Sequence, residues 1–437
     1  MTPTAAPDRS RLRGPASRPG WPVIAQLGRA PSAGPPARGY PLDPFGLIRT
    51  LHRLPSSVRW TVLSLWTVLF TVIHGGSLAG SWHYFDTGAR ALIAVSDPGG
   101  GLHLYHSHPE LQFGPISLLA ALPFTLLPLA WAKVTAVVVM SAAGLVFVAL
   151  ASRLLPAGAR GQILLPALLF IPVWEELAAR AGHLDDVLAL TLALGALLTL
   201  RQRRADTTAV LLGLAVGAKP WALPFVFLLL ALPAERRLRA VGWWTAVVAA
   251  TWLPFVLGEP RTLAAAGFRI PNSAGSALRV FGVSDPHTPV WCRAAQLVVG
   301  AAVAYALWRR GRPAAILLGV IAVRLLLDPG TWSYYTAGLL AATMIVDLVV
   351  PPRRWPLPWL TVGAFVLVYV PAYVHVGLLA SQSVQGYLRA GYLLAVLLAI
   401  FQLPMPDARC GAADADRPWF TRVTGCDARC SSPARTR

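Results

Sequence analysis

The chain has 437 residues, of which 55% are hydrophobic and only 13% are charged. Soluble domains are typically about a quarter charged, so this composition excludes an ordinary soluble globular protein. The net charge of +19 lies in the two chain ends and in short clusters between apolar runs, not along one face, which predicts membrane topology and no nucleic-acid partner.

The first 58 residues are rich in Pro, Gly and Arg, and they contain no apolar stretch of the kind found in a signal peptide. We therefore expect residues 1–58 to form a disordered basic arm. Residues 59–403 are predicted to form a transmembrane domain, and residues 404–437 a disordered tail.

Thirteen apolar segments follow between Trp60 and Phe401, several of them shorter than the roughly 20 residues that span a bilayer. The stretch Ile116–Leu150 is interrupted by Pro and is expected to cross once, whereas Thr208–Leu232 is split around Lys219 and is expected to form a hairpin. The predicted fold is an all-α polytopic membrane protein with about 12 transmembrane helices, within a range of about 10 to 13.

Four arginine-rich clusters between apolar segments predict the orientation, and they lie at residues 201–204, 235–239, 309–312 and 353–354. Cytoplasmic loops carry an excess of Arg and Lys, so both termini are expected in the cytoplasm of a multi-pass protein of the cell membrane. Eight of the nine His and ten of the nineteen acidic residues then fall on the extracytoplasmic side. This distribution predicts that function resides on that face.

The first outer loop carries two groups of candidate residues. Residues 84–92 show helical spacing of apolar side chains, which predicts a short interfacial helix with Asp86 near its start. Further along, His106 and His108 are followed by Glu110. Alternate residues in a loop without a second cluster are a weak metal signal, so we expect hydrogen-bonding loop residues and no metal ion.

Three further charged groups lie at the ends of apolar segments. Asp185 and Asp186 directly precede one segment, where either could cap a helix or belong to a site. Lys219, one of only two Lys, lies between two apolar half-segments. An intramembrane cation indicates an anion site, here for a phosphate, or else a side chain that extends to the interface. Arg324 and Asp328 are one helical turn apart and could form an ion pair.

The order of these motifs resembles that of the GT-C membrane glycosyltransferases, and most closely family 87, the polyprenyl-phosphate-mannose-dependent mannosyltransferases. The sequence departs from that family at Tyr334 and Tyr335, where paired His are frequent, and at His183, where Gln or Asn is common. The resemblance covers about residues 60–350 and rests on the outer-loop acid Asp86 and on Phe113–Pro115, Gly182–Asp185 and Leu212–Trp221.

The resemblance implies a GT-C-like fold and transfer of a sugar, mannose in that family, from a polyprenyl-phosphate donor to a glycan or lipid acceptor. The reaction would invert the sugar and proceed at the extracytoplasmic face among membrane lipids, without a cofactor. Asp86 would be the catalytic base and Lys219 would contact the donor phosphate. The other substrate-binding residues that we expect are His183, Asp185, Glu110, Tyr335 and Arg324.

A transporter or flippase of lipid-linked saccharides is the alternative function. Such a protein would place ionisable residues along a path near the bilayer midplane, with broken helices in both halves. One clear break, at Lys219, and the gathering of His and acids at one face favour the transferase. A non-catalytic or other lipid-modifying membrane protein is the third possibility.

Overall fold

The computed structural model describes residues 46–349, 357–374 and 376–402. Within these ranges the chain is helical and has no β-strand, apart from an isolated antiparallel bridge between Pro271 and His287. The all-α fold is therefore confirmed. Residues 1–45 of the predicted arm and the whole predicted tail lie outside the described residues.

The α-helices of the described residues are α1 (Gly46–Arg53), α2 (Ser56–His74), α3 (Trp82–Ile93), α4 (Leu104–Ser107), α5 (Pro115–Ala121), α6 (Leu129–Ser152), α7 (Leu164–Glu175), α8 (Leu184–Arg201), α9 (Ala205–Ala218), α10 (Ala234–Gly258), α11 (Ala277–Val280), α12 (Cys292–Arg309), α13 (Ile316–Leu326), α14 (Tyr335–Val349), α15 (Trp359–Ala364) and α16 (Gln382–Gln402). Shorter 3-10 or π-helical segments between them include η3 (Leu122–Leu126), η4 (Ala157–Ile163), η5 (Glu176–Ala181), η6 (Pro220–Ala231) and η7 (Pro260–Gly267).

Five helical stretches of the described residues are long and apolar enough to cross a membrane, and shorter apolar helices lie among them. The stretch that contains α7 is the most enclosed, with 78% of its apolar window buried, whereas the windows of α2 and α10 are only 11% buried. Helices α2 and α10 therefore leave apolar side chains to face lipid. Multi-pass membrane character is confirmed, and the number of crossings stays a prediction. The five stretches are Ser56–Ser77, Leu129–Ser152, Ala157–Ala181, Ala234–Gly258 and Gln382–Gln402.

The two Pro-interrupted stretches break where the sequence predicts. The stretch Ile116–Leu150 divides into α5, η3 and α6, and α6 alone has 24 residues, long enough to cross once. The stretch Thr208–Leu232 divides at Lys219 into α9 and η6, which pack against each other. Lys219 has extended backbone because the residue before a Pro is disfavoured in the helical conformation.

The boundary of the N-terminal arm differs from the prediction. Within residues 1–58 the structure has helix α1, and α2 already begins at Ser56. Leu51 and Leu54 pack against the hydrophobic core, and Gly161 of η4 lies so close to His52 that a Cβ at Gly161 would be 1.9 Å from the His52 carbonyl oxygen. The apolar contacts thus order the last part of the arm.

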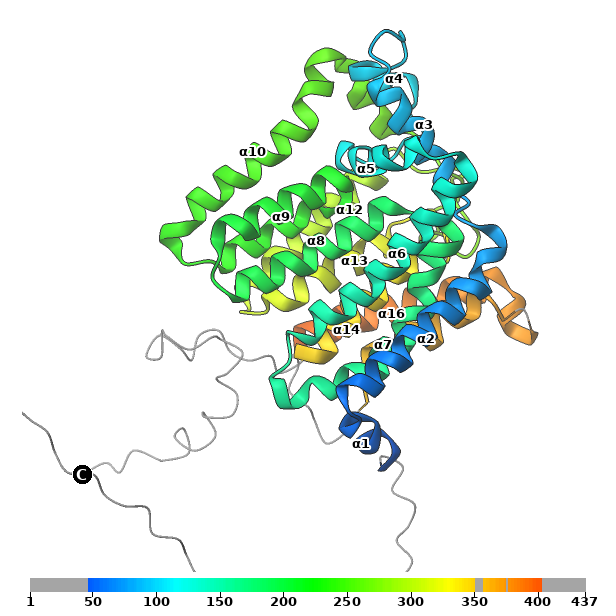
Figure 1. The fold of residues 1–437 in the computed structure, drawn as a ribbon, viewed down its shortest axis with the longest axis vertical. Helices are drawn as coiled ribbons and strands as arrows, with labels where there is room; N and C mark the ends of the chain where they lie inside the picture. Colours follow the sequence, from blue (N-terminus) through cyan, green and yellow to red (C-terminus); the bar gives the residue numbers. More distant parts are fainter. Residues whose placement is uncertain (1–45, 350–356, 375, 403–437) are drawn as a thin grey trace, which may run out of the picture. The chain divides into compact units, whose positions relative to one another are not determined.

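Charged side chains gather at two different ends of the helices. We call one the acid end, where His74 at the end of α2 lies 3.2 Å from Glu176. Helices α3, α4 and α5 lie close together in Figure 1, and the segment that leads into α3 is hydrogen-bonded to η5 at this end. We call the other the arginine end, where Arg side chains donate to carbonyl oxygens at the last turns of helices. Its contacts include Arg201 with Arg153 and Leu154, Arg312 with Ile400, and the ion pair of Arg239 with Asp206.

Candidate active site

A cavity of about 500 Å³ lies at the acid end, with walls contributed by α9, η6, α10, η7, α12, α13 and the loop before α5. Most of its lining is aliphatic or aromatic, and a small number of polar groups converge on it. This combination is typical of a binding site for a partly apolar ligand. The charged lining residues are Lys219, Arg293, Arg324 and Asp328.

Two of the sequence motifs meet to form one wall of the cavity. The backbone N–H of Gly114 donates to the carbonyl oxygen of Ala218 over 2.8 Å, and the Ser117 hydroxyl donates to the same oxygen over 3.1 Å. A Cβ at Gly114 would lie only 2.0 Å from the Gly217 carbonyl oxygen, so this close approach requires glycine. The contact brings Phe113 and Lys219 into the same cavity lining.

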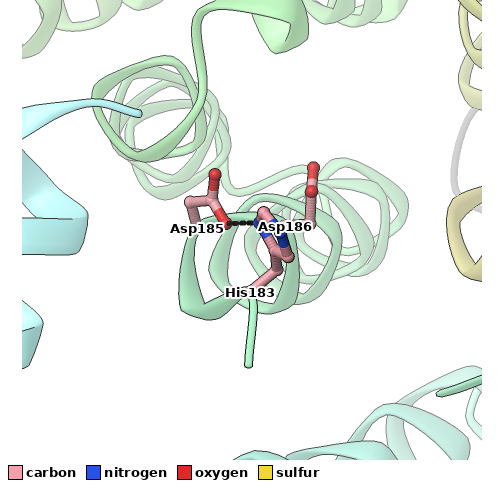
Figure 2. A group of neighbouring side chains, drawn as sticks. All are labelled: His183, Asp185 and Asp186. Carbon is pink, nitrogen blue, oxygen red and sulfur yellow. Dashed lines mark hydrogen bonds and ion pairs between the residues drawn. The ribbon is translucent and has the colours of Figure 1, made fainter. Parts of the chain in front are cut away.

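Lys219 is the centre of a buried ion cluster. Its ammonium contacts the carboxylate of Asp185 and lies 3.7 Å from Oδ2 of Asp186. The other oxygen of Asp185 lies 3.3 Å from Nδ1 of His183, as the dashed line in Figure 2 shows. The Lys219 side chain is 11% exposed, and that exposed part faces the cavity. The ammonium is therefore paired inside the protein and available to a ligand.

Arg324 belongs to the same cluster from a different helix. Its guanidinium lies between two rings, 4.6 Å from the centroid of Trp221 and 4.7 Å from that of Tyr335. It is 3.9 Å from Asp186 and 3.8 Å from Asp328, which confirms the predicted pair of Arg324 and Asp328. Stacking and ion pairing together hold the planar guanidinium in one orientation.

The carboxylates of the cluster compensate its cations. A buried charge is costly unless it is paired and hydrogen-bonded. The Asp186 carboxylate lies near both Lys219 and Arg324, and it accepts a hydrogen bond from Trp221 Nε1 over 3.0 Å. The N-cap of α8 is His183, without a side-chain capping bond, so capping does not explain Asp185 and Asp186. In the first turn of α8 they are also favoured by the helix dipole.

His183, Asp185 and Asp186 also resemble a metal-binding group, because one ligand atom from each lies within 4.8 Å of the others (Figure 2). Lys219 already places a positive charge against both carboxylates. A divalent cation would have to bind beside this ammonium, against like-charge repulsion.

Asp86 lies outside this cluster, in the first half of the predicted interfacial helix, which the structure shows as α3. Its carboxylate accepts two hydrogen bonds from Arg90, over 3.0 and 3.2 Å. The contact raises the pKa of the Arg90 guanidinium. Asp86 does not line the cavity, but the neighbouring Phe85 stacks on the lining residue Phe113 at 4.3 Å.

The remaining predicted residues divide into two groups. His183 stacks on Tyr334 at 4.0 Å, and Tyr334 contacts Tyr335, so His183 and Tyr335 join the neighbourhood of Lys219. Glu110 is 38% exposed and lies 3.3 Å from His108. The structure therefore brings together five of the predicted residues and leaves Asp86 and Glu110 in the outer loop. The five are His183, Asp185, Lys219, Arg324 and Tyr335.

Several cavity residues were missed by sequence reasoning. Arg293 and Gln296 enter from the first turns of α12. Asp328, predicted only as an ion-pair partner of Arg324, is the one carboxylate among the lining residues that the structure describes. Burial raises the pKa of Asp328, and the Arg324 guanidinium opposes that shift. A charged residue at the start of an apolar segment, as Arg293 is, was the available signal.

Comparisons with known proteins indicate the family of this chain. Residues 112–329, which include the Lys219 cluster, match the profile described as glycosyltransferase family 87. The chain is also 26% identical over 306 residues to a polyprenol-phosphate-mannose-dependent alpha-(1-2)-phosphatidylinositol mannoside mannosyltransferase of Mycobacterium tuberculosis (strain ATCC 25618 / H37Rv), an alignment that covers 62% of this chain and 70% of the relative. No solved structure gives a significant match. The chain belongs to family 87 of the GT-C membrane glycosyltransferases.

Proposed function

We propose that this glycosyltransferase moves a sugar, mannose by analogy with its mycobacterial relative, from a polyprenyl-phosphate donor to a glycan or lipid acceptor. One observation carries the proposal: two buried cations, Lys219 and Arg324, line a largely apolar cavity among apolar helices. A polyprenyl-phosphate sugar combines an apolar chain with an anionic phosphate. Its chemistry therefore matches both parts of the lining.

The two cations suit the charge change of this reaction. Transfer breaks the bond between the sugar's anomeric carbon and the phosphate oxygen, and it forms a bond from the acceptor oxygen to that carbon. The departing polyprenyl phosphate gains negative charge as a diester becomes a monoester. Lys219 and Arg324 are already held by Asp186, so they can stabilise this charge without reorganising.

We assign Asp86 as the base that takes the acceptor proton, in a single displacement that inverts the sugar. Asp86 is reachable, with a side chain that is 15% exposed, and Arg90 orients it. Asp86 is connected to the cavity lining through its neighbour Phe85, which stacks on the lining residue Phe113. Asp328, which lines the cavity directly, is the competing candidate base.

The acid end is proposed to face the extracytoplasmic side, with both termini in the cytoplasm, because the three Arg clusters that the structure describes, at residues 201–204, 235–239 and 309–312, lie at the opposite end. In a background without other cysteines, exposed Ser107 of α4 and exposed Ser57 at the start of α2 can each be replaced. An impermeant thiol reagent added to intact cells should label Ser107→Cys and not Ser57→Cys. The reverse pattern would contradict the proposed face.

The activity itself is tested with the purified full-length chain in detergent and a synthetic polyprenyl-phosphate mannose. We expect release of polyprenyl phosphate that depends on an added mannoside acceptor, and a product with inverted anomeric configuration by NMR. Movement of the intact donor across vesicles, without bond cleavage, would instead support the transporter alternative.

A further inference from the structure

A second pocket lies at the arginine end, between α1 and η4, and has a volume of about 240 Å³. Helix α1 lies at the end of α2 that is opposite to α3 (Figure 1), so this pocket is separate from the candidate active site. A Cβ added at Gly158 would meet no atom within 4 Å, which shows that the wall is open at this residue. The lining residues are His52, Arg53, Gly158, Ala159, Gly161 and Gln162.

The pocket lies where two candidate membrane spans begin. The span Ser56–Ser77 starts directly after α1 and a short turn, and the span Ala157–Ala181 starts with η4 itself. Helices α2 and α7 of these spans pack against each other, and the apolar window of α2 is only 11% buried. Because both spans start here beside lipid-facing α2, the pocket lies at the level of the lipid headgroups.

The charge around the pocket is positive and is not balanced by acids. Arg53 in its wall is exposed, as are Arg160 of η4 and Arg153 just before η4. None of these three takes part in an ion pair among the described residues. The segments that form this corner, residues 44–85 and 111–174, contain no Asp or Glu. The pocket therefore attracts anions.

Helix α1 has the character of a helix that lies along a membrane surface. Ile48 and Leu51 are half-buried, whereas Thr50 and Arg53 are exposed, so its apolar and polar side chains are on different faces. Such helices lie in the interface and bind anionic lipids through their basic face. Burial lowers the pKa of His52, so its ring is neutral near pH 7 and the positive charge of the pocket comes from arginine.

We propose that the pocket between α1 and η4 binds the phosphate of an anionic phospholipid, with Arg53 in its wall and Arg160 beside it supplying the charge. A lipid phosphate is favoured over a free phosphate because the pocket lies beside lipid-facing α2, at headgroup level. The bound lipid would hold α1 against η4 at the membrane surface. This site is independent of the proposed function, since it lies at the other end of the helices.

The test uses the full-length protein in phosphatidylcholine vesicles that contain a phosphatidylglycerol probe with a diazirine in its headgroup. A phosphatidylcholine probe with the same diazirine is the zwitterionic comparison. After irradiation, mass spectrometry measures the probe attached to residues 46–54 and 157–163. The variants are Arg53→Gln/Arg160→Gln and Arg53→Lys/Arg160→Lys. Arg204→Gln is the matched control, because Arg204 is an exposed Arg of the arginine end that does not line the pocket.

We expect phosphatidylglycerol to label these two segments of wild type more than phosphatidylcholine does. Each Arg near a membrane surface contributes about fivefold to binding of an anionic lipid, so the double Gln variant should lose about 25-fold. The double Lys variant should retain most of the labelling because it keeps both charges, and Arg204→Gln should label as wild type does. If the double Gln variant does not fold, each single Gln variant should still lose about fivefold.

Three results would overturn the lipid site. One is equal labelling of the two segments by both probes in wild type, and another is unchanged labelling in the folded Gln variants. The third is displacement of the probe by inorganic phosphate beyond that caused by sodium chloride of equal ionic strength, because this would indicate a site for free phosphate.

Discussion

Two pairs of adjacent acids lie at the acid end, and only one of them belongs to the cavity. Glu175 is the last residue of α7 and Glu176 the first of η5, and Asp185 and Asp186 lie in the first turn of α8, so the rest of η5 and a short loop separate the pairs. All four are buried. The aspartates contact cations that line the cavity, whereas the contacts of the glutamates lead away from it. Residue type and position along the chain are thus similar, and the partners decide the role.

The glutamate pair connects helices. The Glu175 carboxylate accepts from the hydroxyl of Ser141 in α6 over 2.5 Å and from that of Thr71 in α2 over 3.0 Å. Glu176 lies 3.2 Å from His74 and 3.0 Å from Arg180. These residues do not line the cavity. The contacts support a structural role in holding α2, α6 and α7 together.

The largest expected effect concerns a residue outside both pairs, the proposed base Asp86. Asp86→Asn keeps the shape and the contact with Arg90 but removes basicity, so turnover should fall by about 10² to 10⁴. Single-turnover release of polyprenyl phosphate measures this. Asp97→Asn, an exposed acid of the same loop, is the control and should be near normal. Loss of turnover in Asp328→Asn with normal Asp86→Asn would move the base to Asp328.

The next largest effect is expected when the ion pair between Lys219 and Asp185 is changed. Removing Lys219 alone takes the ammonium away from the buried carboxylate of Asp185, and breaking a buried ion pair costs about 3 to 5 kcal/mol. The double variant Lys219→Met/Asp185→Asn removes both charges, so it should recover much of the stability but not the donor contact. We expect the KM for the donor to rise about tenfold to a hundredfold.

Two quantities are measured for each variant: the thermal unfolding midpoint in detergent, and the dependence of turnover on donor concentration. Lys219→Arg should restore donor binding only partly, because the planar guanidinium is bulkier beside Pro220. Unchanged donor kinetics in the folded double variant would show that Lys219 serves structure alone, as the glutamates do.

A smaller effect is expected at the glutamate pair, and on stability only. Glu176→Gln removes the charge that faces His74 and Arg180, at a cost of about 1 to 3 kcal/mol in unfolding free energy. The donor KM should stay within about twofold of wild type, since Glu176 does not line the cavity. A rise in donor KM as large as that of the Lys219 variants would erase the distinction between the pairs.

The smallest effect is expected for Glu175→Gln. Glu175 has hydroxyl partners and, in the described part of the chain, no cation within ion-pair distance. Gln keeps an acceptor oxygen and removes the cost of burying charge, so the unfolding midpoint should stay the same or rise slightly. A clear drop in the midpoint at pH 7 would indicate that the ionised carboxylate is needed at this position.

Much of the fold could be predicted from local sequence. The short helix around Asp86, the break at Lys219 and the ion pair of Arg324 with Asp328 all follow from helical spacing or from Pro geometry, and the structure contains each of them. The prediction that residues 1–58 form a disordered arm missed helix α1, because the apolar residues Leu51 and Leu54 find partners only after folding.

The site was less accessible to prediction. Sequence identified Lys219 as an unusual cation, but its partner Asp185 is 34 residues away and on another helix. Hydropathy cannot assign such a contact, since many acids at this end have the same local surroundings. Arg293 illustrates the same limit, because its hydrogen bonds to Gln112 and to the carbonyl oxygen of Phe268 are visible only once its neighbours are in place.

The sequence by itself determined that this protein lies in a membrane, that its fold is helical, and at which end its ionisable residues gather. These properties can be predicted because hydropathy and charge act on each segment separately. Only the tertiary structure decided which acids face which cations, and whether a charge lines the cavity or is enclosed between helices. Those outcomes depend on distances of a few ångströms between segments far apart in the chain, where burial makes an unpaired charge costly. Asp185 and Glu175, ten residues apart, show this dependence on tertiary contacts.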